Sequence, residues 1–409
     1  MADGLDVWLY GRRVATIDEQ RRRPRLTYTD DALSRYPLGT PLLGLTLPVR
    51  PERFPQGVVR PFIDGLLPEG QSRLAIAEHF NLLASDTYAL IRAIGRDCAG
   101  AVVIQPAGEP APPPPSTLQA KPLIEGELAE LVAHLSTAPL GVGERVRISL
   151  GGVQEKLLLT LMPDGGWGLP VDGAPTTHIL KLEIPRFPLT VENEAFCMRI
   201  ARHLGIVVAH VETMTLGSQK LLVVERYDRI VHPDGAVERI HQEDFCQATA
   251  TIPDHKYEED GGPSLRHIAG LLQAVGSSDA LDNLLRAVTM NALVGNGDAH
   301  AKNFSLVHTP TGALTLAPMY DVLSTLHYGN ERLAMYVDNV HQSNQVRTQR
   351  IVNEATAWGL SRTNAIVIVD DLLARAPDAM AAARDETDGV SAELFATVRN
   401  QLARLRSKE

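Results

Sequence analysis

The sequence predicts an α+β fold built from a strand-rich lobe, a helical lobe and a separate α+β domain ahead of both. Three observations support this prediction. Short apolar segments bounded by turn residues dominate 123–228. From residue 242 onward, apolar residues recur at three- and four-residue spacing, which is typical of amphipathic helices. The densest proline run, at 106–116, favours an extended linker between the first domain and the two lobes.

The first domain, 1–105, combines strands and helices. We expect strands at 5–10, 13–18, 25–29 and 101–105 and helices at 71–81 and 85–95. A linker at 106–122 then leads into an N-terminal lobe at 123–228 and a C-terminal lobe at 229–409. These boundaries follow from changes in composition and in apolar periodicity.

The two lobes differ in the elements that the pattern predicts. The first should hold strands at 145–150, 156–162, 177–182 and 219–226 and one helix at 192–204. The second should be all-helical, with helices at 264–275, 278–294, 347–358, 363–376 and 391–406, apart from a strand-like 313–317. A strand-rich lobe followed by a helical one is the layout of a protein-kinase-like fold, although layout alone does not establish function.

Composition excludes several classes of protein. The 409 residues carry a formal net charge of -10, so direct DNA binding by the chain itself is disfavoured. The arginine run at 21–25 is expected to be a solvated hairpin face, and a DNA contact within a complex stays open. Three scattered cysteines, no secretory signal and no long apolar run predict a cytoplasmic protein that contacts no membrane.

The most informative segment is GNGDAHAKNF at 295–304. It follows the helix predicted at 278–294, which should end at a glycine, so its polar residues lie on a loop. Asp298 and Asn303 are five residues apart. Protein kinases use this separation for a base that accepts the substrate hydroxyl proton and an amide that holds magnesium. Lys302 can place positive charge beside the transferred phosphoryl group.

A second acid should complete the metal site. Asp321 lies 18 residues beyond Asn303, after the strand-like 313–317. Mg²⁺ prefers such oxygen ligands and keeps several waters. The sequence therefore predicts a magnesium site made of Asn303 and Asp321.

The strand-rich lobe supplies candidate contacts to a nucleotide. Adjacent Gly151 and Gly152 let backbone N–H groups approach phosphates, although two glycines also suit a hairpin turn. Lys181 lies in an apolar strand, where a kinase places the lysine that pairs with the α- and β-phosphates. Glu194, on the core-facing side of the helix at 192–204, is the expected ion-pair partner of Lys181.

The segment LLVVERYDR at 221–229 ends the strand-rich lobe and should pass the adenine. Backbone groups near Glu225 and Tyr227 are the expected adenine contacts.

Taken together, these segments resemble the HipA family of toxin kinases from toxin–antitoxin pairs. The matching stretches are ISLGGVQEK, THILKL, the VENE helix, VERYDR, QEDFCQ, KYEEDGGP, GDAHAKNF and APMYDVLS, in the family's order over about 148–324. The first 105 residues resemble the family's N-terminal domain more loosely. One departure is Ala299, where a glycine is common, which should be tolerated unless position 299 needs a positive φ.

The resemblance implies a Ser/Thr protein kinase that uses ATP and Mg²⁺. Asp298 would be the base, Asn303 and Asp321 the magnesium ligands, and Ser149 the self-phosphorylated serine. The implied catalytic set is Asp298, Lys181, Asn303 and Lys302, and the implied ATP contacts are Gly151, Gly152, Val153, Gln154, Glu155, Lys156, Lys181, Glu225, Arg226, Tyr227, His300, Ala301, Lys302, Asn303, Tyr320 and Asp321.

The resemblance also implies partners. They are a small helix-turn-helix antitoxin of the HipB type, DNA reached only through that antitoxin, and a protein substrate such as an aminoacyl-tRNA synthetase. Two alternatives stay open: a small-molecule kinase of the aminoglycoside or choline type, because D-x-H-x-x-N occurs there too, and an inactive co-repressor that only binds the antitoxin. A zinc hydrolase using His300 is disfavoured because no third ligand is evident.

Overall fold

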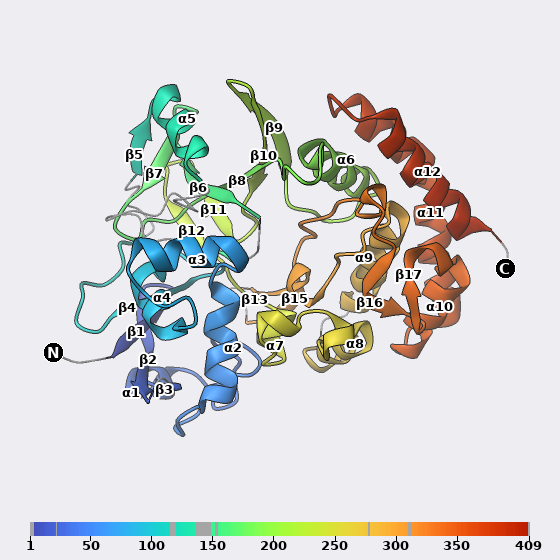
Figure 1. Ribbon diagram of the computed structural model, residues 1–409. Coiled ribbons are helices and arrows are strands. Elements are labelled where there is room, and N and C mark those ends of the chain that lie inside the picture. The colour runs from blue at the N-terminus through green and yellow to red at the C-terminus, as the bar shows by residue number, and fades with distance from the viewer. Residues whose placement is uncertain are drawn as a thin grey trace. The chain divides into compact units, whose positions relative to one another are not determined.

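The computed structural model describes residues 4–21, 23–114, 120–135, 149–151, 154–276, 279–309 and 312–407. The chain forms two compact units (Figure 1). The first unit comprises Met1–Lys181 and Glu225–Asp254, and the second comprises Leu182–Val224 and His255–Glu409. The mixed α+β fold class predicted from the sequence is confirmed.

A four-stranded antiparallel sheet begins the first unit. Its order is β3-β2-β1-β4, from β1 (Leu5–Leu9), β2 (Arg12–Gln20), β3 (Arg23–Tyr28) and β4 (Val102–Pro106). Four helices accompany it: α1 (Asp30–Arg35), α2 (Gln56–Leu66), α3 (Gly70–His79) and α4 (Thr87–Ile94). Helix α2 packs on β3 and α4, and α4 packs on β4, which buries one apolar core.

A second set of strands in the first unit carries the predicted nucleotide contacts. The order β5-β7-β6-β8 is formed by β5 (Ala120–Leu123), β7 (Trp167–Pro170), β6 (Lys156–Leu161) and β8 (His178–Leu182), with α5 (Glu125–Ala133) beside β5. The unit closes with β11 (Arg229–Val231), β12 (Val237–Arg239), β13 (His241–Asp244) and the one-turn helix α7 (Phe245–Ala248).

The second unit is mainly helical. Its helices are α6 (Thr190–His203), α8 (Leu265–Ala274), α9 (Ala280–Val294), α10 (Thr348–Ala357), α11 (Arg362–Asp385) and α12 (Ala392–Arg406). Helix α11 packs against α6, α9, α10 and α12 (Figure 1). Ser264, Ser361 and Ser391 cap α8, α11 and α12, each accepting a backbone N–H three residues on.

The prediction of an all-helical C-terminal lobe is wrong in detail. The second unit contains the hairpins β14 (Ser305–His308) with β15 (Leu314–Leu316) and β16 (Arg332–Val337) with β17 (Val340–Gln342). The antiparallel pair β9 (Val211–Leu216) and β10 (Gln219–Glu225) lies instead within the predicted strand-rich lobe, and β10 matches the strand predicted at 219–226. Strands of three to six residues carry too few apolar positions to separate a period of two from a helical one.

Helix α11 is longer than the predicted 363–376 because it continues through Pro377. A proline cannot donate to the carbonyl four residues earlier, which here belongs to Leu373. The Arg406 guanidinium donates to that carbonyl oxygen instead. Of the strand predicted at 145–150, residues 145–148 lie outside the described residues, and Ser149 and Leu150 are not in a strand. In the part of the chain that the structure describes, no helix is both long and apolar enough to cross a membrane.

Candidate active site

The predicted catalytic loop follows helix α9 directly. Gly295 ends the helix with a φ of 65°, as the sequence predicts. The Asn296 side chain then donates to Asn291 Oδ1 over 2.9 Å and accepts the backbone N–H of Asp298 over 3.1 Å. The loop is therefore fastened to the buried helix immediately before the predicted base.

Asp298 and Asn303 lie on the same turn of chain. The Asn303 Nδ2 group donates to the Asp298 carbonyl oxygen over 3.0 Å, and a 3₁₀ turn covers Ala301–Asn303. The His300 N–H also donates to the Asp298 carbonyl, over 2.8 Å. The five-residue spacing thus holds the carboxylate and the amide on one compact loop.

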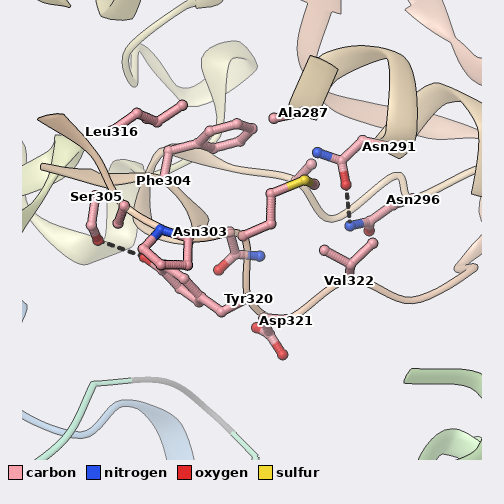
Figure 2. A pocket seen from close by; sticks show the side chains of 14 residues that line it. Ala287, Asn291, Asn296, Asn303, Phe304, Ser305, Leu316, Tyr320, Asp321 and Val322 are labelled. Atoms are coloured by element: carbon pink, nitrogen blue, oxygen red, sulfur yellow. Dashed lines mark hydrogen bonds between the residues drawn. The ribbon is translucent and has the colours of Figure 1, made fainter. Parts of the chain in front are cut away.

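Asp321 joins this loop in a small pocket. Asn303, Tyr320 and Asp321 all line it, and Figure 2 shows their side chains together. The Tyr320 hydroxyl donates to the Lys302 carbonyl oxygen over 2.7 Å and also lies 2.7 Å from Ser305 Oγ. Asp321 has a φ of 59°, an uncommon backbone conformation that is often found at functional sites.

These oxygen ligands fit a magnesium ion. One carboxylate and one amide oxygen, supplemented by water and substrate phosphates, are the usual protein share of a Mg²⁺ site. No group of three or more His, Cys, Asp or Glu side chains that could hold a metal occurs among the described residues. The side chains of Asn303 and Asp321 both line the pocket and could supply these oxygen atoms.

The other predicted residues of this loop are mostly buried. Lys302, His300 and Ala301 are buried, and Ala299 does not have a positive φ, so the alanine at 299 is tolerated. Sequence reasoning missed Tyr257, whose hydroxyl donates to Asp298 Oδ1 over 2.7 Å. Tyr257 lies in KYEEDGGP, a stretch used only for the family resemblance, and no spacing rule relates it to Asp298.

In the first unit, two lysines that the sequence predicts to bind phosphates lie opposite each other on neighbouring strands. Lys156 on β6 pairs with Lys181 on β8, so both side chains lie on one face of the sheet, and both are buried. Lys156 Nζ donates to the Gly151 carbonyl over 2.9 Å. Gly152 and Val153 lie outside the described residues, and Gln154 and Glu155 are half-buried before β6.

Ser149 is fully buried in the first unit. Its Oγ donates to the Leu66 carbonyl over 2.6 Å, and its N–H donates to the Asp97 carbonyl over 2.8 Å. In this conformation the hydroxyl is bound at the end of α2.

The segment VERYDR is anchored by a buried network of ion pairs. The Arg226 guanidinium donates twice to Asp228, at 2.9 and 2.8 Å, while Arg229 and Arg239 contact Asp97 at 2.9 and 3.1 Å. Burial alone would raise the pKa of Asp97, but the neighbouring arginines outweigh it and hold that pKa below its usual value.

This network engages Arg226, which the sequence predicted as an ATP contact. The Arg226 N–H donates to the Thr177 carbonyl over 2.9 Å, while Glu225 is exposed and the Tyr227 hydroxyl donates to Gln242. The ATP contacts in this segment stay predictions.

Helix α6 carries two buried glutamates in the second unit. Glu194 is buried, as its helical face predicts, and Glu192 is buried as well, with its carboxylate 2.5 Å from Lys220 Nζ. Lys181 belongs to the first unit, so its ion pair with Glu194 stays a prediction.

Comparison with known proteins supports one family over nearly the whole chain. The family model of the HipA N-terminal domain matches residues 5–105, and that of the HipA-like C-terminal domain matches 148–380. The protein named "Putative kinase Y4mE" from Sinorhizobium fredii is 43% identical over 331 residues, covering 79% of this chain and 78% of that protein. The serine/threonine-protein kinase toxin HipA of Shewanella oneidensis is 31% identical over 338 residues, covering 78% of this chain and 76% of that toxin.

A solved structure resembles the whole chain. It is the Shewanella oneidensis MR-1 toxin–antitoxin complex of HipA, HipB and operator DNA, which matches with a TM-score of 0.83 and 27% identity over 98% of this chain and 95% of that one. The sequence motifs, the two family models and this structural match all point to one assignment: the chain belongs to the HipA family.

Proposed function

We propose that this chain is a serine/threonine protein kinase that transfers the γ-phosphoryl group of Mg-ATP to a protein hydroxyl. The observation that carries the proposal is the grouping of three side chains in the second unit. Asp298 and Asn303 lie on one loop, and Asn303 and Asp321 line one pocket. A base, an amide and a second acid are the parts that phosphoryl transfer requires.

Asp298 would accept the proton of the attacking substrate hydroxyl. The hydroxyl oxygen would bond to the γ-phosphorus while the bond from that phosphorus to ADP breaks and ADP leaves. Magnesium held by Asn303 and Asp321 would neutralise charge on the phosphate oxygens. Lys302, which is buried and follows the base by four residues, would stabilise charge on the transferred group. Lys156 and Lys181, opposed on β6 and β8, would bind the remaining phosphates.

We propose Ser149 as a site of self-phosphorylation. A phosphate there adds about -1.5 to -2 charges to a position that is fully buried. It would also remove the hydroxyl that donates to Leu66, so the segment would have to leave its present position. We expect Ser149→Ala to stop self-phosphorylation. A variant that still takes up as much phosphate as the wild type, located on other residues by mass spectrometry, would contradict this choice of serine.

We also propose a small HipB-like helix-turn-helix antitoxin as partner. Support comes from the solved relative, which is a complex of HipA, HipB and operator DNA. The net charge of -10 favours DNA contact through that partner rather than through this chain. The family resemblance suggests a protein of the aminoacyl-tRNA synthetase class as the substrate. We propose that this chain acts in the cytoplasm.

The test is incubation of the full-length chain with [γ-³²P]ATP, Mg²⁺ and a cell lysate, followed by separation of proteins from small molecules. We expect label on serine or threonine of a protein, and none with Asp298→Asn. Label confined to a soluble alcohol would instead identify a small-molecule kinase. The absence of both label and ADP from the wild-type reaction would identify an inactive antitoxin-binding module.

A further inference from the structure

The hydroxyl group of Tyr257 lies directly on the proposed base. It donates to Asp298 Oδ1 over 2.7 Å, and both residues belong to the second unit and are half-buried. Tyr257 comes from the segment 256–262 (KYEEDGG), which lies 41 residues before Asp298 in the sequence.

The segment 256–262 is held in place by contacts other than the bond to Asp298. The N–H groups of Asp260 and Gly262 donate to the Tyr257 carbonyl over 3.1 and 2.9 Å. Glu258 accepts the Tyr336 N–H over 2.7 Å. A Cβ at Gly262 would lie 2.3 Å from the His255 carbonyl oxygen, so the turn closes tightly around a glycine.

The Tyr257 ring is also fixed against the catalytic loop. It meets the His300 ring edge-on, with centroids 5.3 Å apart and planes at 86°. Lys256 Nζ lies 5.8 Å from the Tyr257 ring centroid, and the Lys256 carbonyl accepts the Ala301 N–H over 3.4 Å. The backbone and ring contacts therefore fix the position of the Tyr257 hydroxyl group independently of its hydrogen bond to Asp298.

We propose that Tyr257 is a positioning residue for phosphoryl transfer, whose hydroxyl orients the Asp298 carboxylate. This inference rests on the proposed kinase function and adds a residue to it. A donor fixed by its own backbone holds one carboxylate oxygen and thereby sets the direction of the other. Hydrogen bonds to a charged acceptor are roughly twice as strong as neutral ones, so the hydroxyl is a substantial restraint.

The informative variant is Tyr257→Phe, which keeps the ring against His300 and Lys256 and removes only the hydroxyl. Tyr336→Phe is the matched control, because the Tyr336 ring stacks on His341 at 4.0 Å and no hydrogen bond of its hydroxyl enters the proposed mechanism. ADP formation from Mg-ATP by each full-length chain gives kcat, and calorimetry gives ATP affinity.

For Tyr257→Phe we expect kcat to fall by about tenfold or more, since the lost hydrogen bond is to a charged group. ATP affinity should match that of the wild type. The number of ATP sites per chain in the same calorimetry reports the fraction of folded protein. A fall in kcat with unchanged affinity and unchanged site number therefore cannot come from a loss of stability alone.

The outcomes separate this inference from the proposed function. An active wild type with unchanged kcat in Tyr257→Phe would overturn the role of Tyr257 alone. A rise in kcat would overturn it too, since the hydroxyl would then mask the carboxylate. Wild-type protein that forms no ADP, or full activity in Asp298→Asn, would overturn the kinase proposal itself.

Discussion

At the scale of single residues, the sequence predicted which side chains lie close together where one short motif contains them. Asp298 and Asn303 are tied together by a local hydrogen bond, so their spacing alone indicated their proximity. Asp321 was placed by its strand, which the structure gives as Leu314–Leu316. Tyr257 could not be predicted, because its bond to Asp298 depends on tertiary packing rather than on spacing.

The metal role of Asp321 is tested by Asp321→Asn. Asparagine tolerates the left-handed backbone at φ 59°, so the variant changes the charge with little strain. We expect ATP affinity to fall about tenfold in the presence of Mg²⁺, because hard cations prefer carboxylates, and to stay unchanged in EDTA, as measured by calorimetry.

Asp338→Asn is the matched control for this change. Asp338 also has a positive φ, 50°, and contacts Arg350 rather than the pocket. Equal affinities of Asp321→Asn and wild type for Mg-ATP would remove Asp321 from the metal site.

At the scale of elements, close backbone contacts fix the catalytic loop. A Cβ at Gly297 would lie 2.2 Å from the Arg332 carbonyl oxygen, and the Gly297 N–H donates to Thr325 Oγ1 over 2.7 Å. We expect Gly297→Ala to lower the free energy of unfolding by about 1–3 kcal/mol and to reduce ADP formation, because Asp298 follows directly.

The control is Gly270→Ala in α8, where an added Cβ meets nothing within 4 Å. It should stabilise the protein by about 0.5–1 kcal/mol, since alanine favours a helix interior. Chemical denaturation of both variants measures the difference, and a neutral Gly297→Ala would show that the loop adapts easily.

A second element-scale prediction concerns the buried ion pairs that join the loop after α4 to β11 and β12. Asp97→Asn removes the carboxylate that contacts Arg229 and Arg239 at 2.9 and 3.1 Å, and Arg229 keeps its ion pair with Asp228. Breaking such a buried pair costs about 3–5 kcal/mol of unfolding free energy. Asp31→Asn, which removes an exposed pair with Arg35, should leave stability unchanged. Similar melting temperatures for both variants would contradict this account.

Predictions of elements from the sequence matched the structure for most long helices and for the apolar strands β1, β4, β6 and β8, and failed for several other elements. Helices α8, α9, α10 and α12 were predicted closely because each carries ten residues or more of apolar spacing. Helix α2 was missed although it is 11 residues long, because Pro61 interrupts its pattern. Strands β14, β16 and β17 were missed, whereas β15 corresponds to the strand-like segment predicted at 313–317.

At the scale of the whole molecule, stability should depend on pH through Glu243. Burial raises the pKa of Glu243 to about 8. The Leu45 N–H, which lies 2.9 and 3.1 Å from the two carboxylate oxygens, lowers this pKa but does not offset the burial. Between the ordinary pKa of a glutamate and about pH 8, Glu243 is therefore protonated in the folded chain and ionised in the unfolded chain. This contribution to stability is present at low pH and is lost as the pH rises towards 8.

The variant Glu243→Gln mimics the protonated carboxyl group and should flatten this decline between pH 5 and 8. Urea unfolding at several pH values measures it. The same slope in the variant and the wild type would show that other groups control the pH dependence.

The central claim is that Asp298 is the base of a phosphoryl-transfer site, and Asp298→Asn tests it most directly. The amide keeps the size of the side chain but cannot accept the proton, so ADP formation from Mg-ATP should fall by about a hundredfold or more. ATP affinity by calorimetry and the melting temperature should remain those of the wild type. A variant that binds ATP normally and turns it over at the wild-type rate would contradict the account.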